Sequence, residues 1–160
     1  MDKKKAITLV GFVLLCEIVG AIGSIFTVPN ISTWYYALIK PFFSPPNWLF
    51  GPVWTILFLL MGVGLYLVWE TKQKKYSKQR KTAINWFIVQ FGFNLLWSYL
   101  FFGLRNPTFG FIGVLFLWVS IAITISKFYK VNPKAAYLLV PYILWVSFAT
   151  ILNYSIMVLN

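Results

Sequence analysis

The chain has 160 residues, of which 60% are hydrophobic and only 11% are charged. Ordinary soluble domains carry about 25% charged residues, so this composition excludes a soluble domain and predicts an integral membrane protein. The net charge is +11, but the basic residues lie between apolar stretches, which argues against a nucleic-acid partner. The absence of histidine excludes imidazole as a metal ligand or general base, and no metal site is expected.

Five apolar stretches follow one another along the chain, at about residues 6–28, 46–69, 82–104, 107–128 and 134–159. Each is long enough to cross the roughly 30 Å hydrocarbon core of a bilayer as a helix. No segment alternates with a two-residue period, so barrel strands are not expected. The sequence therefore predicts an all-α membrane protein in which residues 1–160 form one domain of five transmembrane helices.

The first stretch begins with a lysine run and ends with small residues, as a signal peptide does. Its apolar run of about 23 residues instead favours an uncleaved span. Glu17 lies in the middle of this span. A carboxylate at the bilayer centre costs several kcal/mol unless it is paired or protonated. Glu17 is therefore a candidate functional carboxylate, and the alternative is a protonated side chain that hydrogen-bonds a neighbouring helix.

The segment from residue 34 to 58, WYYALIKPFFSPPNWLFGPVWTILF, joins the first two spans. Ser32 or Thr33 before an aromatic run predicts a short helix in this first external loop. Aromatic side chains here fit a belt at the lipid headgroups. For Trp34 and Tyr35 we favour a lid over a cavity, because the four prolines of the segment restrict the backbone and reduce the entropy lost on ordering.

Prolines also predict helix boundaries. Pro45-Pro46 fits a helix start, since the first turn does not need those N–H groups. Pro52 predicts a local kink, and Asn106-Pro107 predicts a tight turn between the third and fourth spans. Pro133 is expected to open the fifth span, and Pro141 to bend it.

Basic residues predict the orientation of the spans. Twelve of the 14 lie before the first span or in the second and fourth connections, while only Lys40 and Arg105 lie in the other two. The positive-inside rule then places the N-terminus in the cytoplasm and the C-terminus outside. Lys40 and Arg105 either meet acidic groups of a ligand at the rim of a cavity or face solvent and headgroups.

Helical spacing gathers aromatic and polar residues on three faces. These faces comprise Trp54, Phe58 and Met61; Gln90, Asn94, Trp97, Ser98 and Phe101; and Tyr142, Trp145, Ala149 and Asn153. Ligand cavities are mostly apolar with a few orienting polar groups, as these faces are. The alternative is ordinary helix packing with interhelical hydrogen bonds.

Three blocks carry a family resemblance: WYYALIKPFFSPPNWLFGPVWTILFLLMGVGLYLVW, FGFNLLWSYLFFG and PYILWVSFATILNYSIMVLN. They resemble the TspO/MBR family, the tryptophan-rich sensory proteins, which include the translocator protein or peripheral-type benzodiazepine receptor. The resemblance covers nearly the whole chain. It implies a homodimer of five-helix bundles, and the short loops of the chain favour a prokaryotic plasma membrane. It also implies an aromatic ligand cavity between the helices that the first loop closes.

The resemblance implies particular ligands and site residues. Family ligands include porphyrins such as protoporphyrin IX and haem, and no cofactor is required. The positions that match cavity-facing ones are Trp34, Tyr35, Trp54, Phe58, Asn94, Trp97, Trp145 and Ala149. Trp34 and Trp145 match a pair implicated in light-driven porphyrin chemistry. No basic residue follows Tyr154, where animal members carry a cholesterol-recognition motif, so the sequence departs from the family pattern there and leaves sterol binding open.

Three functions follow from these observations. The first is a membrane receptor, sensor or carrier that binds porphyrins and related hydrophobic ligands. The second is a light-dependent porphyrin-degrading activity that uses tryptophan residues, because no nucleophile–base pair or metal site is evident. The third is a tetrapyrrole or lipid transporter that acts as a dimer, although no internal duplication is visible.

Overall fold

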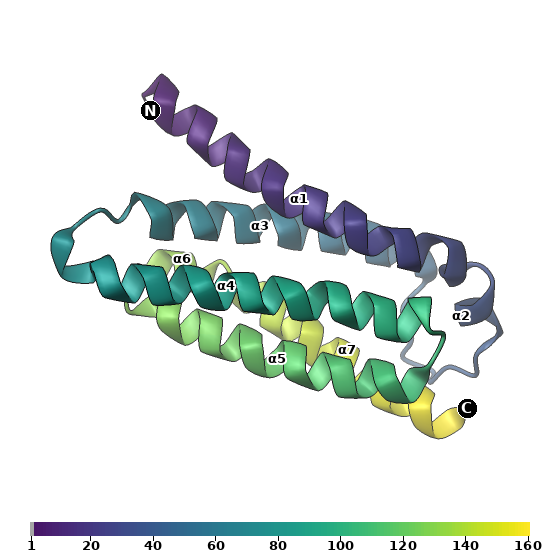
Figure 1. The fold of residues 1–160 in the computed structure, drawn as a ribbon. Helices are drawn as coiled ribbons and strands as arrows, with labels where there is room; N and C mark the ends of the chain where they lie inside the picture. The colour runs from purple at the N-terminus through teal and green to yellow at the C-terminus, as the bar shows by residue number, and fades with distance from the viewer. Residues whose placement is uncertain (1) are drawn as a thin grey trace.

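The chain folds into a bundle of long helices, and the computed structural model describes residues 2–160 (Figure 1). The long helices are α1 (Lys3–Ile31), α3 (Phe50–Glu70), α4 (Ser77–Ser98), α5 (Pro107–Tyr129) and α7 (Val140–Leu159). Short helices lie between them: α2 (Trp34–Ala37), η1 (Asn47–Leu49), η2 (Lys74–Tyr76), η3 (Tyr99–Gly103) and α6 (Pro133–Tyr137). Residues 2–160 contain no strand, and five helical segments are long and apolar enough to span a membrane. The predicted fold class is confirmed, and the chain is an integral membrane protein.

Local side-chain chemistry sets the helix ends. Asn106 precedes Pro107 and its Oδ1 accepts a hydrogen bond from the Phe109 amide at 3.0 Å, which caps α5. Asn132 caps α6 in the same way through the Lys134 amide at 3.1 Å. The predicted turn at Asn106-Pro107 and the predicted start at Pro133 are therefore confirmed.

The fifth span differs from the expected bent helix. It consists of two helices, α6 and α7, which are separated at residues 138–139. Pro141 lies in the first turn of α7, where its missing N–H costs no intrahelical bond. Pro52 likewise lies in the first turn of α3, which continues through it. Both prolines thus start helices rather than deform them.

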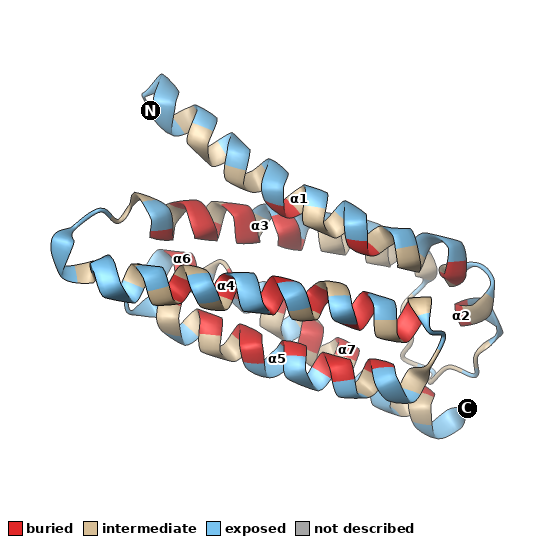
Figure 2. Cartoon of the chain, in the orientation of Figure 1, coloured by how far each residue is buried: buried red, intermediate tan, exposed pale blue. Residues whose placement is uncertain are grey.

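The first helix packs at the edge of the bundle. In the most apolar 18-residue segment of α1, only 11% is buried, whereas 39–44% of the corresponding segment is buried in the other four spans. Figure 1 shows the N-terminal part of α1 diverging from the other helices, and Figure 2 shows it largely exposed. α1 meets α3 at Gly62, where an added Cβ would lie 2.6 Å from the Val13 Cα. Because no side chain stands between them, the two backbones can approach closely at this point.

The remaining helices enclose the core. Buried positions on α3, α4, α5 and α7 face one another in the interior of the bundle (Figure 2). α4 is tied to its neighbours by two hydroxyl groups: Ser98 donates to the Gly23 carbonyl at 2.8 Å, and Thr124 donates to the Trp86 carbonyl at 3.1 Å. These bonds connect α4 with α1 on one side and with α5 on the other.

The α1–α3 contact predicts an effect of Gly62→Ala. A methyl group there must push against the Val13 backbone, which no rotamer change relieves, and overpacking of this kind costs about 1–3 kcal/mol. We expect Gly62→Ala to unfold in detergent at a lower temperature than the unsubstituted protein, with unfolding monitored by intrinsic fluorescence. The control is Gly92→Ala, because a Cβ at Gly92 meets nothing within 4 Å and alanine is the better helix former. Equal unfolding temperatures for both variants would contradict the close contact.

Candidate functional site

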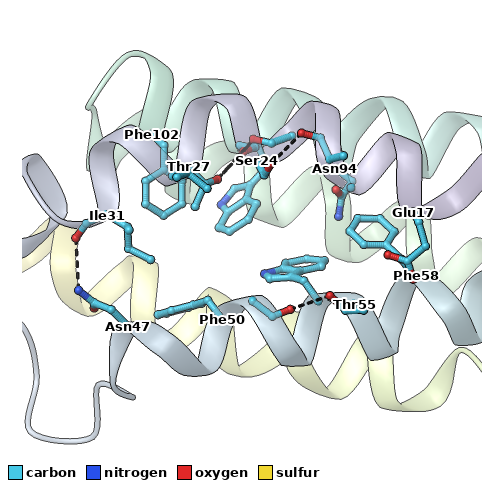
Figure 3. Close-up of a pocket in the computed structure, with 18 of the residues that line it drawn as sticks. Glu17, Ser24, Thr27, Ile31, Asn47, Phe50, Thr55, Phe58, Asn94 and Phe102 are labelled. Carbon is cyan, nitrogen blue, oxygen red and sulfur yellow. Dashed lines mark hydrogen bonds between the residues drawn. The ribbon is translucent and has the colours of Figure 1, made fainter.

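A cavity of about 480 Å³ lies between α1, the first half of α3 and the second half of α4. This volume is within the usual range of about 300–1,000 Å³ for small-molecule sites. Figure 3 shows the side chains of α1 and α3 facing each other across it. The cavity runs from Glu17, in the middle of α1, to Ile31 and Asn47 at the ends of α1 and η1.

Aromatic side chains form one wall of the cavity. The ring centroid of Trp54 lies 5.6 Å from that of Phe58 and 6.0 Å from that of Trp97. The interplanar angles are 30° and 33°, so the Trp54 ring is tilted against each of its two neighbours. Phe58 lies against Gly20 of α1, where any Cβ would meet its ring. The lack of a side chain at Gly20 therefore makes room for this aromatic wall.

Polar groups are fewer, and a buried network orders those on α4. Asn94 Nδ2 donates to the Tyr142 hydroxyl at 3.0 Å, and that hydroxyl donates to Gln90 Oε1 at 3.0 Å. All three residues are buried. The network fixes Asn94, which lines the cavity, against α7. The predicted α4 face is confirmed as buried, and its polar residues bond across helices as the packing interpretation expects.

The first helix contributes residues that the sequence analysis left out. Besides Glu17, its lining residues include Gly20, Ser24, Thr27 and Ile31. Their spacing of three, four, three and four residues keeps them on one helix face. A search for small and polar residues at helical spacing from Glu17 would have found this face. The weak amphipathic pattern of an almost uniformly apolar helix concealed it.

The cavity opens sideways between α1 and α3. Exposed residues at its edge are Ala21 and Val28 on α1 and Gly51 and Thr55 on α3. Trp48, 70% exposed, lies at the end of the same opening. Because both helices are long and apolar enough to span a membrane, we expect this mouth to face the hydrocarbon of the bilayer.

A second hollow, of about 680 Å³, lies at the opposite end of the bundle. Five basic residues line it: Lys74, Lys75, Lys78, Arg80 and Lys81. They belong to η2 and the start of α4, in the connection whose charge the positive-inside rule already explains. Its basic lining does not suit a hydrophobic ligand, so the smaller aromatic cavity is the candidate site.

Comparison with known proteins agrees with the fold and with the aromatic blocks. The model of the TspO/MBR family matches residues 12–159. The chain belongs to this family. It is 44% identical to the tryptophan-rich protein TspO of Archaeoglobus fulgidus, over 95% of this chain and 96% of the relative. It is 44% identical to TspO of Chlorobaculum tepidum, over 98% of each chain, and 35% identical to the human translocator protein, over 91% of this chain and 86% of the relative.

The positions assigned through the TspO/MBR resemblance are divided between two spaces. Trp54, Phe58, Asn94 and Trp97 line the large cavity. Tyr35, Trp145 and Ala149 instead line a second, mostly apolar space of about 20 Å³, which is the size of roughly one water molecule. Four residues line both spaces and form the partition between them: Phe50, Trp54, Trp97 and Phe102. A hydrogen bond of 3.3 Å from Trp97 Nε1 to Asn153 Oδ1 holds one side of this partition.

Trp34 lines neither of these two spaces. Its ring packs edge-on against Phe101 at 5.3 Å and Phe102 at 6.4 Å between centroids. Trp145 packs against Phe50 at 6.1 Å and Phe148 at 5.5 Å. The two tryptophans are thus held by other aromatic side chains, and the photochemical role assigned to them stays a prediction.

The loop that carries Trp34 and Tyr35, residues 32–46, is clamped to two parts of the bundle. α2 is the short helix predicted here, and Tyr35 is buried against Phe50 and Phe102. At the other side, Asn160 binds Ile39 twice: its Oδ1 accepts from the Ile39 amide at 3.0 Å, and its Nδ2 donates to the Ile39 carbonyl at 3.0 Å. No local pattern predicts this pair, because its members lie 121 positions apart in the chain.

The two basic residues near this end of the bundle have intramolecular partners. Lys40 Nζ donates to the carbonyls of Tyr36 and Leu38 and lies 4.9 Å from the Tyr35 ring centroid. Partial burial lowers the pKa of the Lys40 ammonium below its usual value. Arg105 Nε donates to Asn30 Oδ1 at 2.9 Å, from a backbone with a positive φ of 52°. Neither lines the large cavity.

The buried network predicts a cost for Tyr142→Phe. Removing the hydroxyl leaves Gln90 Oε1 without its donor and Asn94 Nδ2 without its acceptor. An unsatisfied buried polar group costs about 1–3 kcal/mol, so we expect a clearly lower unfolding temperature in detergent. Tyr137→Phe is the matched control, because Tyr137 is 63% exposed. A Tyr142→Phe protein as stable as the control would show that the network contributes nothing.

The Asn160 clamp predicts faster hydrogen exchange in Asn160→Ala. The variant loses both bonds to Ile39, and each contributes about 0.5–1.5 kcal/mol. We expect amide exchange in residues 32–46 to accelerate roughly tenfold, as measured by mass spectrometry in detergent. The exposed Asn85 supplies the control substitution Asn85→Ala, which should leave this loop unchanged. Unaltered exchange at Ile39 in the Asn160 variant would rule out the clamp.

Proposed function

We propose that this protein is a membrane receptor, sensor or carrier that binds a flat hydrophobic ligand of the porphyrin class in the cavity between α1, α3 and α4. The observation that carries the proposal is the aromatic wall of Phe58, Trp54 and Trp97, whose neighbouring rings lie 5.6 and 6.0 Å apart and border the cavity. Such a wall offers a large aromatic surface to a planar ring system.

Family membership supports the same conclusion. Relatives carry the names tryptophan-rich sensory protein and translocator protein, which agree with a protein that detects or carries a ligand. Protoporphyrin IX is the ligand that the family resemblance suggests for this chain. The sideways mouth suits it, because a hydrophobic porphyrin partitions into the bilayer before it binds.

The loop of residues 32–46 fits the role of a lid in this proposal. It lies at the end of the bundle where the cavity terminates in Ile31 and Asn47. Asn47 Nδ2 donates to the Ile31 carbonyl at 3.3 Å, which joins the two ends of the loop beside the cavity. The aromatic contacts of Trp34 and Tyr35 and the Asn160 clamp hold the loop over the bundle.

The test is a titration of the detergent-purified protein with protoporphyrin IX in the dark. Binding is monitored through the intrinsic tryptophan fluorescence. We expect saturable quenching. Gly51→Phe places a ring at the mouth, where a Cβ meets nothing within 4 Å, and should weaken binding at least about tenfold. Gly11→Phe is the matched control, because Gly11 also has open space and lies outside the cavity.

The outcomes of this titration separate the possibilities. Quenching that does not saturate would overturn the proposed site. So would a porphyrin affinity that is the same in both phenylalanine variants and in the unsubstituted protein. Illumination of the bound complex then tests the light-dependent alternative, through loss of porphyrin absorbance. If that loss occurs and disappears in Trp34→Phe and Trp145→Phe, the predicted tryptophan photochemistry gains its support.

A further inference from the structure

Most hydrogen-bond donors around the large cavity are already engaged within the protein. The hydroxyl of Ser24 donates to the Ala21 carbonyl at 2.7 Å, and that of Thr55 donates to the Gly51 carbonyl at 3.1 Å. Ser98 donates to the Gly23 carbonyl, as described above. Each of these hydroxyls has a single hydrogen, so it meets the cavity only with its acceptor lone pairs.

The amide and indole groups follow a similar pattern. Asn94 and Asn47 each use one N–H of the side-chain NH₂ group in an internal hydrogen bond, which leaves the second N–H as a donor and the side-chain oxygen as an acceptor. Trp97 donates its single N–H to Asn153. Trp54 and Trp48 have no hydrogen-bond partner for their N–H among residues 2–160. The polar lining therefore offers acceptor atoms on its hydroxyl and amide groups, together with a few N–H donors.

Glu17 adds the single ionisable side chain to the lining that the structure describes. It has no hydrogen-bond or ion-pair partner among residues 2–160; the ion pairs of that range are those of Glu70 with Lys5 and Lys72. The two basic residues near the other end of the cavity, Lys40 and Arg105, do not line it and therefore do not pair with Glu17. The alternative expectation for Glu17, a hydrogen bond to a neighbouring helix, is thus not met in this structure.

The position of Glu17 suits a positively charged group. It lies beside Phe58 at the inner end of the aromatic wall (Figure 3). A cation is attracted both by a carboxylate and by the faces of aromatic rings, and both attractions strengthen where water is excluded. A carboxylate without a partner inside a bilayer is costly, and a cationic ligand would relieve this cost.

We propose that Glu17 makes this cavity selective for hydrophobic ligands that present a cationic or N–H donor group at its inner end, with aromatic amines as the simplest class. The proposal rests on the proposed function, because it requires that the cavity hold a ligand. For a tetrapyrrole ligand, repulsion by Glu17 would direct the ligand's anionic carboxylates towards the Ile31 end of the cavity. The loop of residues 32–46 lies at this end, and the cavity lining there contains no acidic residue.

The experiment compares two probes that share one ring system and differ in charge. 9-(Methylaminomethyl)anthracene carries a cation at neutral pH, and 9-anthracenecarboxylic acid carries an anion. Binding to the full chain in detergent is followed by the polarisation of anthracene fluorescence. We expect the unsubstituted protein to bind the amine at least about tenfold more tightly than the acid.

Variants assign this preference to one residue. Glu17→Gln keeps the shape of the side chain and removes the charge, so it should weaken amine binding at least about tenfold and not weaken acid binding. Glu70→Gln is the matched control, since Glu70 lies at the far end of α3 outside the cavity, and should behave as the unsubstituted protein. Glu17→Asp retains the charge on a shorter stem and should keep a preference for the amine.

The results distinguish this inference from the proposed function. An amine affinity unchanged in Glu17→Gln, with an unfolding temperature equal to that of the unsubstituted protein, would overturn the role of Glu17. Protoporphyrin IX is titrated into the same samples. If the porphyrin binds but the protein binds the amine no more tightly than the acid, the proposed selectivity fails and the porphyrin site stands. If neither porphyrin nor amine binds, both proposals fail.

Discussion

The hydrocarbon of a bilayer offers no hydrogen-bond partners, so the polar groups of the five spans must satisfy one another. The structure meets this constraint in two ways. Threonine and serine hydroxyls such as Thr55 bond back to their own helix, while the Asn94–Tyr142–Gln90 chain and the Ser98 bond join α4 to α7 and α1. The arrangement of the helices follows from these few bonds. Glu17 takes part in none of these bonds, and its unpaired carboxyl group in the cavity is the reason for its functional interest.

The cavity lies where small and polar side chains of α1 face aromatic rings of its neighbours. Gly62 brings the α1 and α3 backbones together at Val13, and Ser98 ties α4 to Gly23 further along α1. α3 and α4 direct aromatic rings towards the α1 face. Large rings opposite small residues leave the space that the α1 face of Glu17, Gly20 and Ser24 borders.

Much of the fold could be predicted from the sequence, because apolar length alone specifies the spans and helical periodicity specifies the buried face of α4. Other features depend on contacts between distant residues. No local pattern announces that Asn160 binds Ile39 or that Arg105 adopts a positive φ. The resemblance correctly indicated the family, yet it placed Phe58 and Trp145 in one group, whereas Phe58 lines the large cavity and Trp145 lines the smaller space beside it. Homodimer formation, the orientation of the termini and the host membrane stay predictions.

The sideways mouth has a consequence for how affinity is expressed. Under the proposed function, a cavity whose entrance lies between Ala21 and Thr55 would exchange ligand with the bilayer and not with the surrounding solution. The concentration that governs occupancy is then the mole fraction of ligand dissolved in lipid or detergent. For a strongly partitioning molecule, adding more lipid at a fixed total amount of ligand dilutes it and lowers occupancy. Dissociation constants for this site therefore have meaning only when they are stated with the amount of the apolar phase.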